Sequence, residues 1–425
     1  MERMTPRERL LTAIRNQKPD RVPCAPDISN MIPARLTRRP FWDIYLHENP
    51  PLWRSYLEAM RYFGIDGWFI YGDMQYRYAT PLETEKKEVS RSAERIVIAE
   101  RTRTPAGDLT TETTYYIADP PTVTVKAIKD PKEDWPKLRY LFQEPIGYDP
   151  SLLQVQRKEL GEQGILGVGL ATPGFQAWFG VFHGGIEALT YLYQDHPELV
   201  EELRLLHERS ILKEAEMVIE ARPDFILTGG SGAITLQSPA LVRKLSLPTL
   251  KKTTRMAKEA EMVIEARPDF ILTGGSGAIT LQSPTLARKL NLPTLKKTTH
   301  MAKEAGVLTM VHCCGYEYEL VKMCAEETNL DCINPLEEPP MGDCYLARIK
   351  REFGERLSLM GNLHTTNIML LGSPPEVERA ARQAIDDAAA DGGFILSTGD
   401  QCGRDTPDEN IRKLVEVCKT YGRYD

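Results

Sequence analysis

Short apolar runs alternate with stretches of helical periodicity along most of the chain. Each run has the length of a buried strand, and apolar residues recur at helical spacing in the stretches between them, such as 196–220 and 375–391. Strand–helix alternation repeated eight times predicts an α/β fold, a parallel sheet closed as a (β/α)8 TIM barrel. The predicted strands are 22–28, 67–72, 165–170, 224–230, 307–315, 330–336, 357–363 and 393–399.

The first helix has a recognisable start. Thr5 is placed as the N-cap, Pro6 follows at the first helical position, and Glu8 lies three residues after the cap. This spacing predicts a capping box, in which the side chains of the first and fourth residues bond each other's backbone N–H groups.

Residues 77–137 interrupt the alternation after the second predicted strand. The stretch is polar and rich in threonine, with alternating patterns at 96–98 and 114–117 and a Pro-Ala-Gly turn at 105–107. We expect a β-rich cap insertion over the barrel mouth. A barrel of this kind needs about 250 residues, so the chain of 425 residues has room for it within a single domain, 1–425.

One βα unit is present twice in tandem, as 214–258 and 259–303. Residues 213–260 match 258–305 at 44 of 48 positions, the differences being Ala240/Thr285, Val242/Ala287, Ser246/Asn291 and Arg255/His300. Strand number and barrel diameter are linked, so a ninth strand would disturb the interior packing. We therefore expect eight strands, with the second copy in the barrel and the first outside it or exchanged with a neighbouring chain.

Composition narrows the class of protein. With 42% hydrophobic and 27% charged residues, the chain can bury a large core, and its net charge of −7 argues against nucleic-acid binding. The stretch 163–186 lacks charged residues, but its glycines and Pro173 favour a buried strand and loop over a membrane span. The start carries no apolar signal segment, and eight cysteines in so long a chain are no disulfide framework, so we expect a cytoplasmic protein with reduced thiols.

The segment Val-His-Cys-Cys-Gly at 311–315 ends a predicted strand with potential metal ligands. Because a strand projects alternate residues to opposite faces, His312 and Cys314 share one face. The last strand runs into Ser-Thr-Gly-Asp-Gln-Cys-Gly, which brings Cys402 to the same C-terminal rim, where barrel enzymes place their active sites. One imidazole, two thiolates and an open fourth position describe a catalytic zinc site, although inert buried cysteines are common as well.

Six segments carry motifs that are shared with a known superfamily. They are the opening Met-Thr-Pro-Arg-Glu-Arg-Leu-Leu at 4–11 with its continuation to 23, Gly-Gly-Ser-Gly-Ala-Ile-Thr at 229–235, the segment at 311–315, Asn-Pro-Leu-Glu at 334–337, Met-Gly-Asn at 360–362, and the loop 399–410. On these motifs the chain resembles the uroporphyrinogen decarboxylase superfamily. It is most similar to the corrinoid-dependent zinc methyltransferase branch of that superfamily, which includes the methylcobalamin:coenzyme M methyltransferases.

The resemblance implies an enzyme that moves a methyl group between a corrinoid and a small-molecule donor or thiol acceptor. The zinc ligands of that branch map onto His312, Cys314 and Cys402, although the late loop reads Gly-Asp-Gln-Cys-Gly where Gly-Cys-Gly is expected. A cobalamin-binding protein of the usual kind carries Asp-x-His-x-x-Gly, and no histidine of this chain lies in that motif. We therefore expect the corrinoid, or cobalamin, to arrive on a separate corrinoid protein.

Two other functions stay open. The decarboxylase proper carries an Arg-Gln-Ala-Gly-Arg-Tyr segment near its first strand, whereas residues 23–30 contain no arginine. A metal-independent decarboxylase is thus less favoured than a methyltransferase. A non-catalytic barrel, inactivated by the duplication, is the alternative from another class. An extruded strand copy would expose an apolar edge, which would favour a homo-oligomer.

Four more polar residues lie at the predicted rim. We take Asp73, Glu338 and Asn362 as candidate catalytic residues and Asn334 as a candidate cofactor-binding residue. Each can orient a zinc ligand, a substrate or the incoming corrinoid. Each is equally well explained as a solvated polar group in a loop or as a cap.

Overall fold

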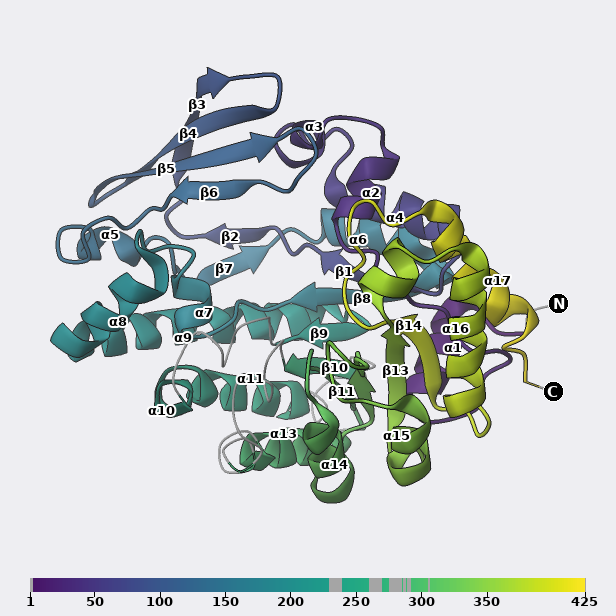
Figure 1. Ribbon diagram of the computed structural model, residues 1–425. Helices are drawn as coiled ribbons and strands as arrows, with labels where there is room; N and C mark the ends of the chain where they lie inside the picture. The colour runs from purple at the N-terminus through teal and green to yellow at the C-terminus, as the bar shows by residue number, and fades with distance from the viewer. Residues whose placement is uncertain are drawn as a thin grey trace.

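The computed structural model describes residues 3–228, 239–259, 270–274, 285, 288, 292–304 and 306–424 (Figure 1). Within these residues eight parallel strands form one sheet in the order β1-β8-β9-β10-β11-β12-β13-β14. Strands such as β8, β13 and β14 are buried along almost their whole length, as expected when both faces of a parallel sheet are covered. The bounds are β1 Gly67–Gly72, β8 Gly164–Gly169, β9 Phe225–Leu227, β10 Phe270–Gly274, β11 Leu308–His312, β12 Cys332–Asn334, β13 Ser358–Leu363 and β14 Phe394–Thr398.

A short segment near the N-terminus lies between the two ends of this sheet. The backbone of Cys24 pairs in parallel with Leu396 of β14. On its other side, the N–H of Asp66, which directly precedes β1, donates a 2.8 Å hydrogen bond to the carbonyl of Cys24. The predicted first strand is reduced to this bridge, and the arrangement is consistent with a TIM barrel.

The duplicated strand corrects one expectation. We expected one copy outside the sheet, but β9 from the first copy and β10 from the second lie side by side, with Phe225 opposite Phe270. Strand β10 also pairs with β11, as expected for the second copy, and β9 pairs with β8. The physical reason is that an extruded strand would leave backbone N–H and C=O groups unpaired, whereas two identical strands pair in register at no such cost.

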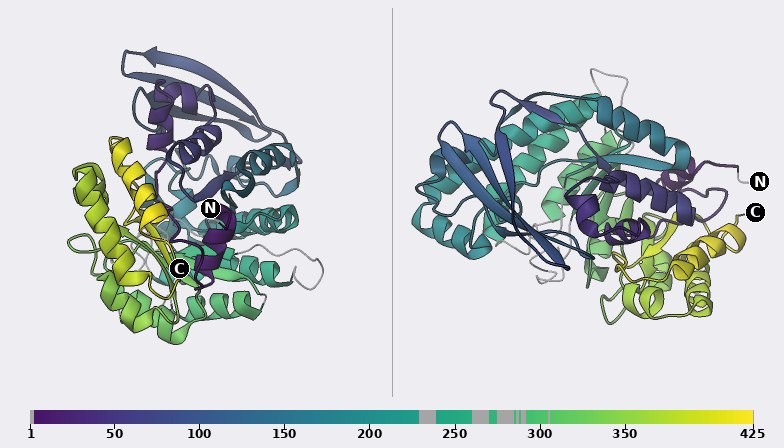
Figure 2. Two further views of the ribbon diagram at one scale, coloured as in Figure 1. Left: turned by 90° about the vertical axis from the view of Figure 1, so that its right-hand side faces the viewer. Right: turned by 90° about the horizontal axis from the view of Figure 1, so that it is seen from above.

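Helices follow the strands and cover the outside of the sheet (Figures 1 and 2). The described α-helices are α1 Pro6–Ile14, α2 Met31–Leu36, α3 Phe41–Tyr45, α4 Leu52–Phe63, α5 Trp135–Leu138, α6 Ser151–Leu160, α7 Phe175–Trp178, α8 Gly185–Asp195, α9 Pro197–Ala221, α10 Pro239–Leu241, α11 Leu247–Glu259, α13 Leu292–Glu304, α14 Tyr318–Glu327, α15 Leu346–Phe353, α16 Pro374–Ala388 and α17 Asp408–Thr420. The main core lies between these helices and the outer face of the strands. This packing makes the strand ends rigid supports for a site.

Helix α1 covers the end of the sheet where the strands begin. The predicted capping box is confirmed, because the Thr5 hydroxyl accepts from the Glu8 N–H and the Glu8 carboxylate accepts from the Thr5 N–H. Apolar residues of α1, including Leu10, pack against Phe225, Met310 and other side chains of the sheet's second buried cluster. The opposite end of the sheet, where the strands finish, is therefore the end that can carry chemistry.

The segment 77–137 holds a four-stranded antiparallel sheet, with β3 Glu83–Arg91, β4 Arg95–Thr104, β5 Gly107–Tyr116 and β6 Thr122–Val125 in sequential order. Strands β4 and β5 meet at a turn that Gly107 leaves with a φ of +114°, where the sequence placed it. The short strands β2 Tyr76–Tyr78 and β7 Pro145–Tyr148 pair at the base of this sheet. Arg404, in the loop after β14, donates to the carbonyl of Ala118 at 2.7 Å, so the small sheet contacts the C-terminal end of the large one.

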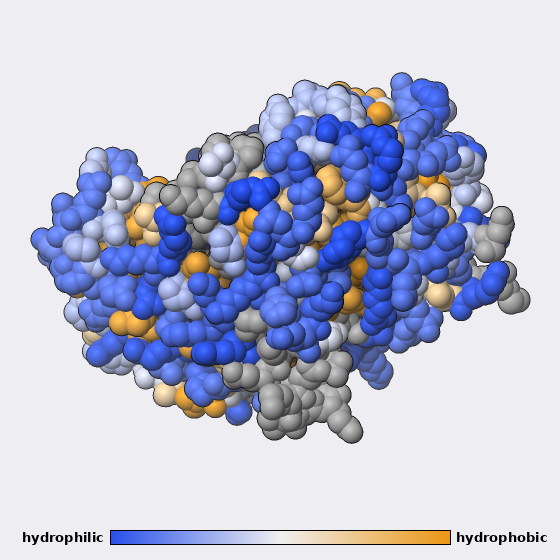
Figure 3. All heavy atoms as spheres, turned by 90° about the horizontal axis from the view of Figure 1, so that it is seen from below, coloured by the Kyte–Doolittle hydropathy of each residue, from blue (hydrophilic) through white to orange (hydrophobic). Residues whose placement is uncertain are grey.

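The two ends of the chain lie close together, on the side away from the small sheet (Figure 2). The face shown in Figure 3 is mostly hydrophilic, and its hydrophobic patches are small and separated. Among the described residues, none of the helices combines the length and apolar character needed to cross a membrane.

Candidate metal centre

His312 and Cys314 meet at the end of β11. His312 is the last residue of the strand and faces the same side as the buried Met310, and the chain then bends so that Cys314 folds back toward the imidazole. The His312 Nε2 atom lies 3.2 Å from the Cys314 sulfur. Both side chains are partly exposed. The sequence placed this pair together, and the structure brings the two ligand atoms within contact distance.

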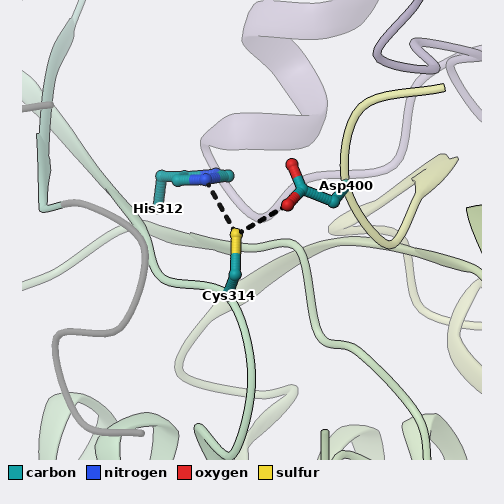
Figure 4. Close-up of side chains that lie close together, drawn as sticks. All are labelled: His312, Cys314 and Asp400. Atoms are coloured by element: carbon teal, nitrogen blue, oxygen red, sulfur yellow. Dashed lines mark hydrogen bonds between the residues drawn. The ribbon is translucent and has the colours of Figure 1, made fainter. Parts of the chain in front are cut away.

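Asp400 is the third member of the group. It follows β14 in the loop that faces β11, and the Cys314 thiol donates a 3.2 Å hydrogen bond to Asp400 Oδ2. One ligand atom from each of the three residues lies within 4.8 Å of the other two, and the side chains point toward one another (Figure 4). An imidazole nitrogen, a thiolate sulfur and a carboxylate oxygen are ligands that zinc accepts, and three protein ligands leave a fourth position open.

Cys402, the third ligand expected from the sequence, is not a member of this group. Its side chain is fully buried in the main core, beside the hydroxyls of Thr398 and Thr406, and its N–H donates to the carbonyl of Asp27 at 2.8 Å. Burial, reinforced by the charge of Asp27, raises the pKa of the Cys402 thiol to about 12. The sequence held the signal for Asp400, because the residue after Gly399 in Gly-Asp-Gln-Cys-Gly takes the place of the expected cysteine.

The other rim residues lie in three different surroundings. Asn334 lies opposite His312 on β12, is 6% exposed, and interacts with the imidazole. Asn362, at the end of β13, donates to Glu338 Oε1 at 2.9 Å, so these two candidates form a pair. Asp73 follows β1, is exposed, and accepts hydrogen bonds from the backbone and side chain of Gln75. The assigned roles of these residues stay predictions.

Two buried glutamates that sequence reasoning missed hold the loop of Cys314. Glu337, which follows β12, accepts from the Gly315 N–H at 2.6 Å. Glu317, which follows β11, accepts from the Leu336 N–H at 2.6 Å. Each loop thus carries a carboxylate that fixes the backbone of the other. A side chain on Gly342 would place its Cβ 2.5 Å from the carbonyl of Gly315, so the two loops are also closely packed.

The electrostatics of the site are dominated by burial and by Asp400. Burial lowers the pKa of His312, against the opposing effects of Asp400 and Asn334, and so favours the neutral imidazole that binds metals. Burial raises the pKa of Asp27 to about 6, and the nearby Asp400 carboxylate adds to this. Burial, again with Asp400, raises the pKa of Glu337. Neighbouring carboxylates that lack a counter-ion raise one another's pKa in this way, because each negative charge disfavours the next.

Comparison with known proteins supports the class that this fold and site suggest. Residues 233–421 match the family model "Uroporphyrinogen decarboxylase (URO-D)". This match confirms, over that part of the chain, the resemblance to the superfamily that the sequence motifs indicated.

Solved structures extend the comparison beyond that domain. A methyltransferase from Methanosarcina mazei shares the fold with a TM-score of 0.52 at 16% identity, covering 98% of this chain and 99% of that one. The 3-keto-D-glucoside 4-epimerase of E. coli aligns with 55% of this chain and 94% of its own at 11% identity, with a TM-score of 0.31. Comparison with curated proteins gave no significant match. At 16% identity, the likeness to the Methanosarcina mazei protein shows a shared fold.

Proposed function

We propose that this protein is a zinc-dependent methyltransferase that moves a methyl group between a corrinoid and a small molecule. The observation that carries the proposal is the His312–Cys314–Asp400 group, which lies at the C-terminal ends of β11 and β14. In barrel enzymes this end of the strands holds the active site. We also propose that residues 22–25 close the sheet into a complete barrel around that site.

Zinc would be held by Asp400 and Cys314 as anions and by His312 as a neutral ligand. Bound there, it would supply Lewis acidity to a thiol or to the atom that carries the transferred methyl group. The charges of the two anionic ligands would balance those of the metal. A carboxylate in place of the second thiolate is the departure from the ligand set that the resemblance implies.

The chain's own residues prepare the ligands. The Cys314 thiol must lose its proton to bind a metal, and Asp400 Oδ2 already accepts the hydrogen bond from that proton. Asn334 lies beside the imidazole of His312 and can fix its orientation and tautomer. The hydrogen bond from the Gly315 N–H to Glu337 fixes the backbone next to Cys314.

The corrinoid would come from a separate protein, because the chain lacks the cobalt-ligating motif that a cobalamin carrier shows. A metal-independent decarboxylase and a non-catalytic barrel are the alternatives that an experiment must exclude. No described feature of the site favours either of them over metal binding.

Metal analysis of the purified chain and its variants tests the proposal. We expect about one zinc per chain, as a single site requires. Zinc should be lost in Cys314→Ser and Asp400→Asn and retained in Cys402→Ser, which removes a thiol outside the group. A chain that binds no zinc, or that loses it only in Cys402→Ser, would contradict the proposed site.

Methyl transfer is then measured with free methylcobalamin or cob(I)alamin and a panel of thiols, methoxylated aromatics and methylated amines. Activity that disappears together with zinc in Cys314→Ser supports the proposed function. Decarboxylation of a tetrapyrrole or other carboxylated substrate by the metal-free chain would support the decarboxylase instead.

A further inference from the structure

Carboxylates outnumber cations at the end of the sheet where the candidate metal centre lies. We define the mouth loops as the described segments that follow strand ends, residues 26–30, 73–75, 170–174, 313–317, 335–345 and 399–407. Arg404 is the one arginine or lysine of these segments. Their acidic residues are Asp27, Asp73, Glu317, Glu337, Glu338, Asp343, Asp400 and Asp405.

The single arginine is already engaged. Arg404 forms ion pairs with Asp119 and Asp405, both at 3.0 Å, and also donates to the carbonyl of Ala118. Among the described residues no lysine or arginine forms an ion pair with the carboxylates nearest the metal centre or at the exposed rim. These are Asp27, Asp73, Glu337, Glu338 and Asp400, and the hydrogen bonds they accept come from neutral groups such as the Asn362 amide and the Gly315 N–H.

A metal ion would not remove this excess. Zinc would neutralise the charges of Cys314 and Asp400, which are its ligands. Asp27, Glu337, Glu338 and Asp73 would keep theirs, because none belongs to the ligand group within the described chain. The mouth therefore stays negative in the metal-loaded protein.

Asn334 provides a second, independent observation. Its side chain is 6% exposed, and in the described structure its Oδ1 atom has no hydrogen-bond donor in good geometry. It lies beside His312, within the site. A buried acceptor without a donor is uncommon and usually marks a place that a ligand or ion completes. An acceptor oxygen of this kind attracts positive charge, as the carboxylates around it do.

We propose that the mouth selects a cationic methyl donor, an ammonium or sulfonium ion that carries the methyl group. This names the substrate class of the function proposed above and rests on it. A cleft lined by charges of one sign concentrates substrates of the opposite sign. An anionic methyl donor would meet repulsion from four carboxylates, and a neutral methyl ether would gain nothing from them.

The chemistry of an onium donor suits these residues. The bond from nitrogen or sulfur to the methyl carbon breaks, and its electron pair stays on the heteroatom, so a neutral amine or thioether leaves. The methyl carbon forms its new bond with the electron pair of Co(I) in the corrinoid, which is the acceptor of the proposed reaction when the small molecule is the donor. No proton has to be delivered to the leaving group, unlike the alkoxide that leaves from an ether.

Binding of matched cationic and neutral ligands tests the proposal without requiring turnover. Tetramethylammonium, trimethylsulfonium and choline are titrated calorimetrically into the zinc-loaded chain, beside 3,3-dimethyl-1-butanol, in which carbon replaces the nitrogen of choline. We expect at least one onium ion to bind about tenfold tighter than the neutral isostere at low salt. The difference should shrink as salt is added.

Charge-neutralising variants locate the effect. Asp73→Asn with Glu338→Gln should weaken onium binding several-fold and flatten its salt dependence. As a control, Glu355→Gln removes one carboxylate charge from the loop before β13, at the opposite end of the sheet, and should leave binding unchanged. Equal affinity for choline and its isostere, or no onium binding at all, would overturn the proposal.

The same purified protein also distinguishes this charge selectivity from the zinc-dependent methyltransferase function on which it rests. Zinc content and methyl transfer are measured in parallel with the binding experiment. Transfer from neutral donors without preference for onium ions would overturn the charge selectivity and leave the methyltransferase intact. Selective onium binding by a chain that holds no zinc would support the selectivity and contradict the zinc-dependent function.

Discussion

At the scale of single residues, the third ligand of the candidate metal centre depends on the backbone of one loop. The hydrogen bond from the Cys402 N–H to the carbonyl of Asp27 fixes this part of the loop after β14. With the backbone held there, the Cys402 side chain lies in the apolar core and the Asp400 side chain lies beside Cys314. A change at position 400 should therefore act on the metal directly, whereas a change at 402 should act on packing.

Replacing Asp400 by cysteine should keep the site functional. Zinc binds thiolates and carboxylates alike, so we expect Asp400→Cys to retain about the zinc content of the unmodified chain. Loaded with Co²⁺, it should show about twice the thiolate-to-metal charge-transfer absorption, because two sulfurs then bind the metal. Unchanged absorption would mean that residue 400 does not reach the metal.

His207 gives a pH-dependent prediction at the same scale. It is 3% exposed and accepts a 3.0 Å hydrogen bond from the indole N–H of Trp178. Burial lowers its pKa to about 4, against about 6.5 in an unfolded chain. As pH falls between these values, the unfolded chain takes up a proton that the folded protein refuses, so stability is lost by about 3 kcal/mol at most.

Comparing His207→Gln with the unmodified chain isolates this effect. Glutamine keeps an acceptor for the Trp178 N–H but does not titrate. The free energy of unfolding is measured by urea denaturation at about pH 7.5 and about pH 4.5. We expect the variant to lose less stability between the two conditions than the parent. Equal losses in both proteins would show that His207 does not titrate in this range.

Sequence reasoning reached some of these residues and not others, for a physical reason. His312 and Cys314 could be paired because a strand has a fixed two-residue period. Asp400 directly follows Gly399, as the expected cysteine would, but a loop has no such period, so the structure was needed to decide between Asp400 and Cys402. Glu317 and Glu337 bond the backbone of each other's loop, and a partner of this kind leaves no pattern in the sequence.

At the scale of elements, a buried ionic group joins the start of the chain to the sheet. The Asp66 carboxylate accepts from Arg9 at 2.6 Å, from Arg21 at 2.7 and 3.0 Å, and from the Cys24 N–H at 2.8 Å. Arg9, Arg21 and Asp66 are all almost completely buried. The group thus ties α1 and the bridging segment to the start of β1.

Removing the charge of Asp66 should destabilise the fold strongly. Asp66→Asn leaves two buried guanidinium groups short of an acceptor, and breaking a buried ionic group in this way costs about 3–5 kcal/mol. Glu352→Gln, which breaks the exposed pair with Arg348, is the control and should cost less than about 1 kcal/mol. Thermal denaturation of both variants checks this order. Similar losses of stability in the two variants would show that burial does not increase the contribution of the Asp66 ion pairs to stability.

The elements themselves were largely predictable. The capping box of α1 and the apolar runs that became sheet strands are local patterns, and they were found where the sequence placed them. The first predicted strand is reduced to a single bridge at Cys24, because its continuation leaves the sheet after Ala25 to form the loop of Asp27. Tertiary geometry at the closure of the sheet, rather than strand propensity, sets that boundary.

At the scale of the whole molecule, the duplication adds a strand between β8 and β11. Such an addition widens a barrel-like sheet, because strand number and diameter are linked. The sequence showed the repeat but not its outcome, which depends on the balance between unpaired backbone outside the sheet and looser packing within it. In the structure the paired arrangement prevails, with β9 and β10 in direct register.

This register predicts that one copy can be removed without loss of the fold. Phe225 lies opposite Phe270, so β9 and β10 occupy the same height and present the same residues to their neighbours. Deleting 214–258 leaves a single copy that can pair with β8 as β9 does and with β11 as β10 does. We expect the shortened chain to fold, to retain its zinc, and to unfold at the same or a higher temperature, because the narrower sheet packs its interior more fully.

Deleting 259–303 instead is the matched control. It removes the same length and leaves a chain that differs from the first deletion only at the four positions where the copies diverge. If the copies are structurally equivalent, the two shortened proteins should agree in unfolding temperature and zinc content. If one deletion abolishes folding or zinc binding and the other does not, the copies are not equivalent. The copy whose loss is not tolerated would then be the one that the sheet and the metal centre require. Loss of both properties in both deletions would show that the widened sheet is the one that the remaining sequence requires.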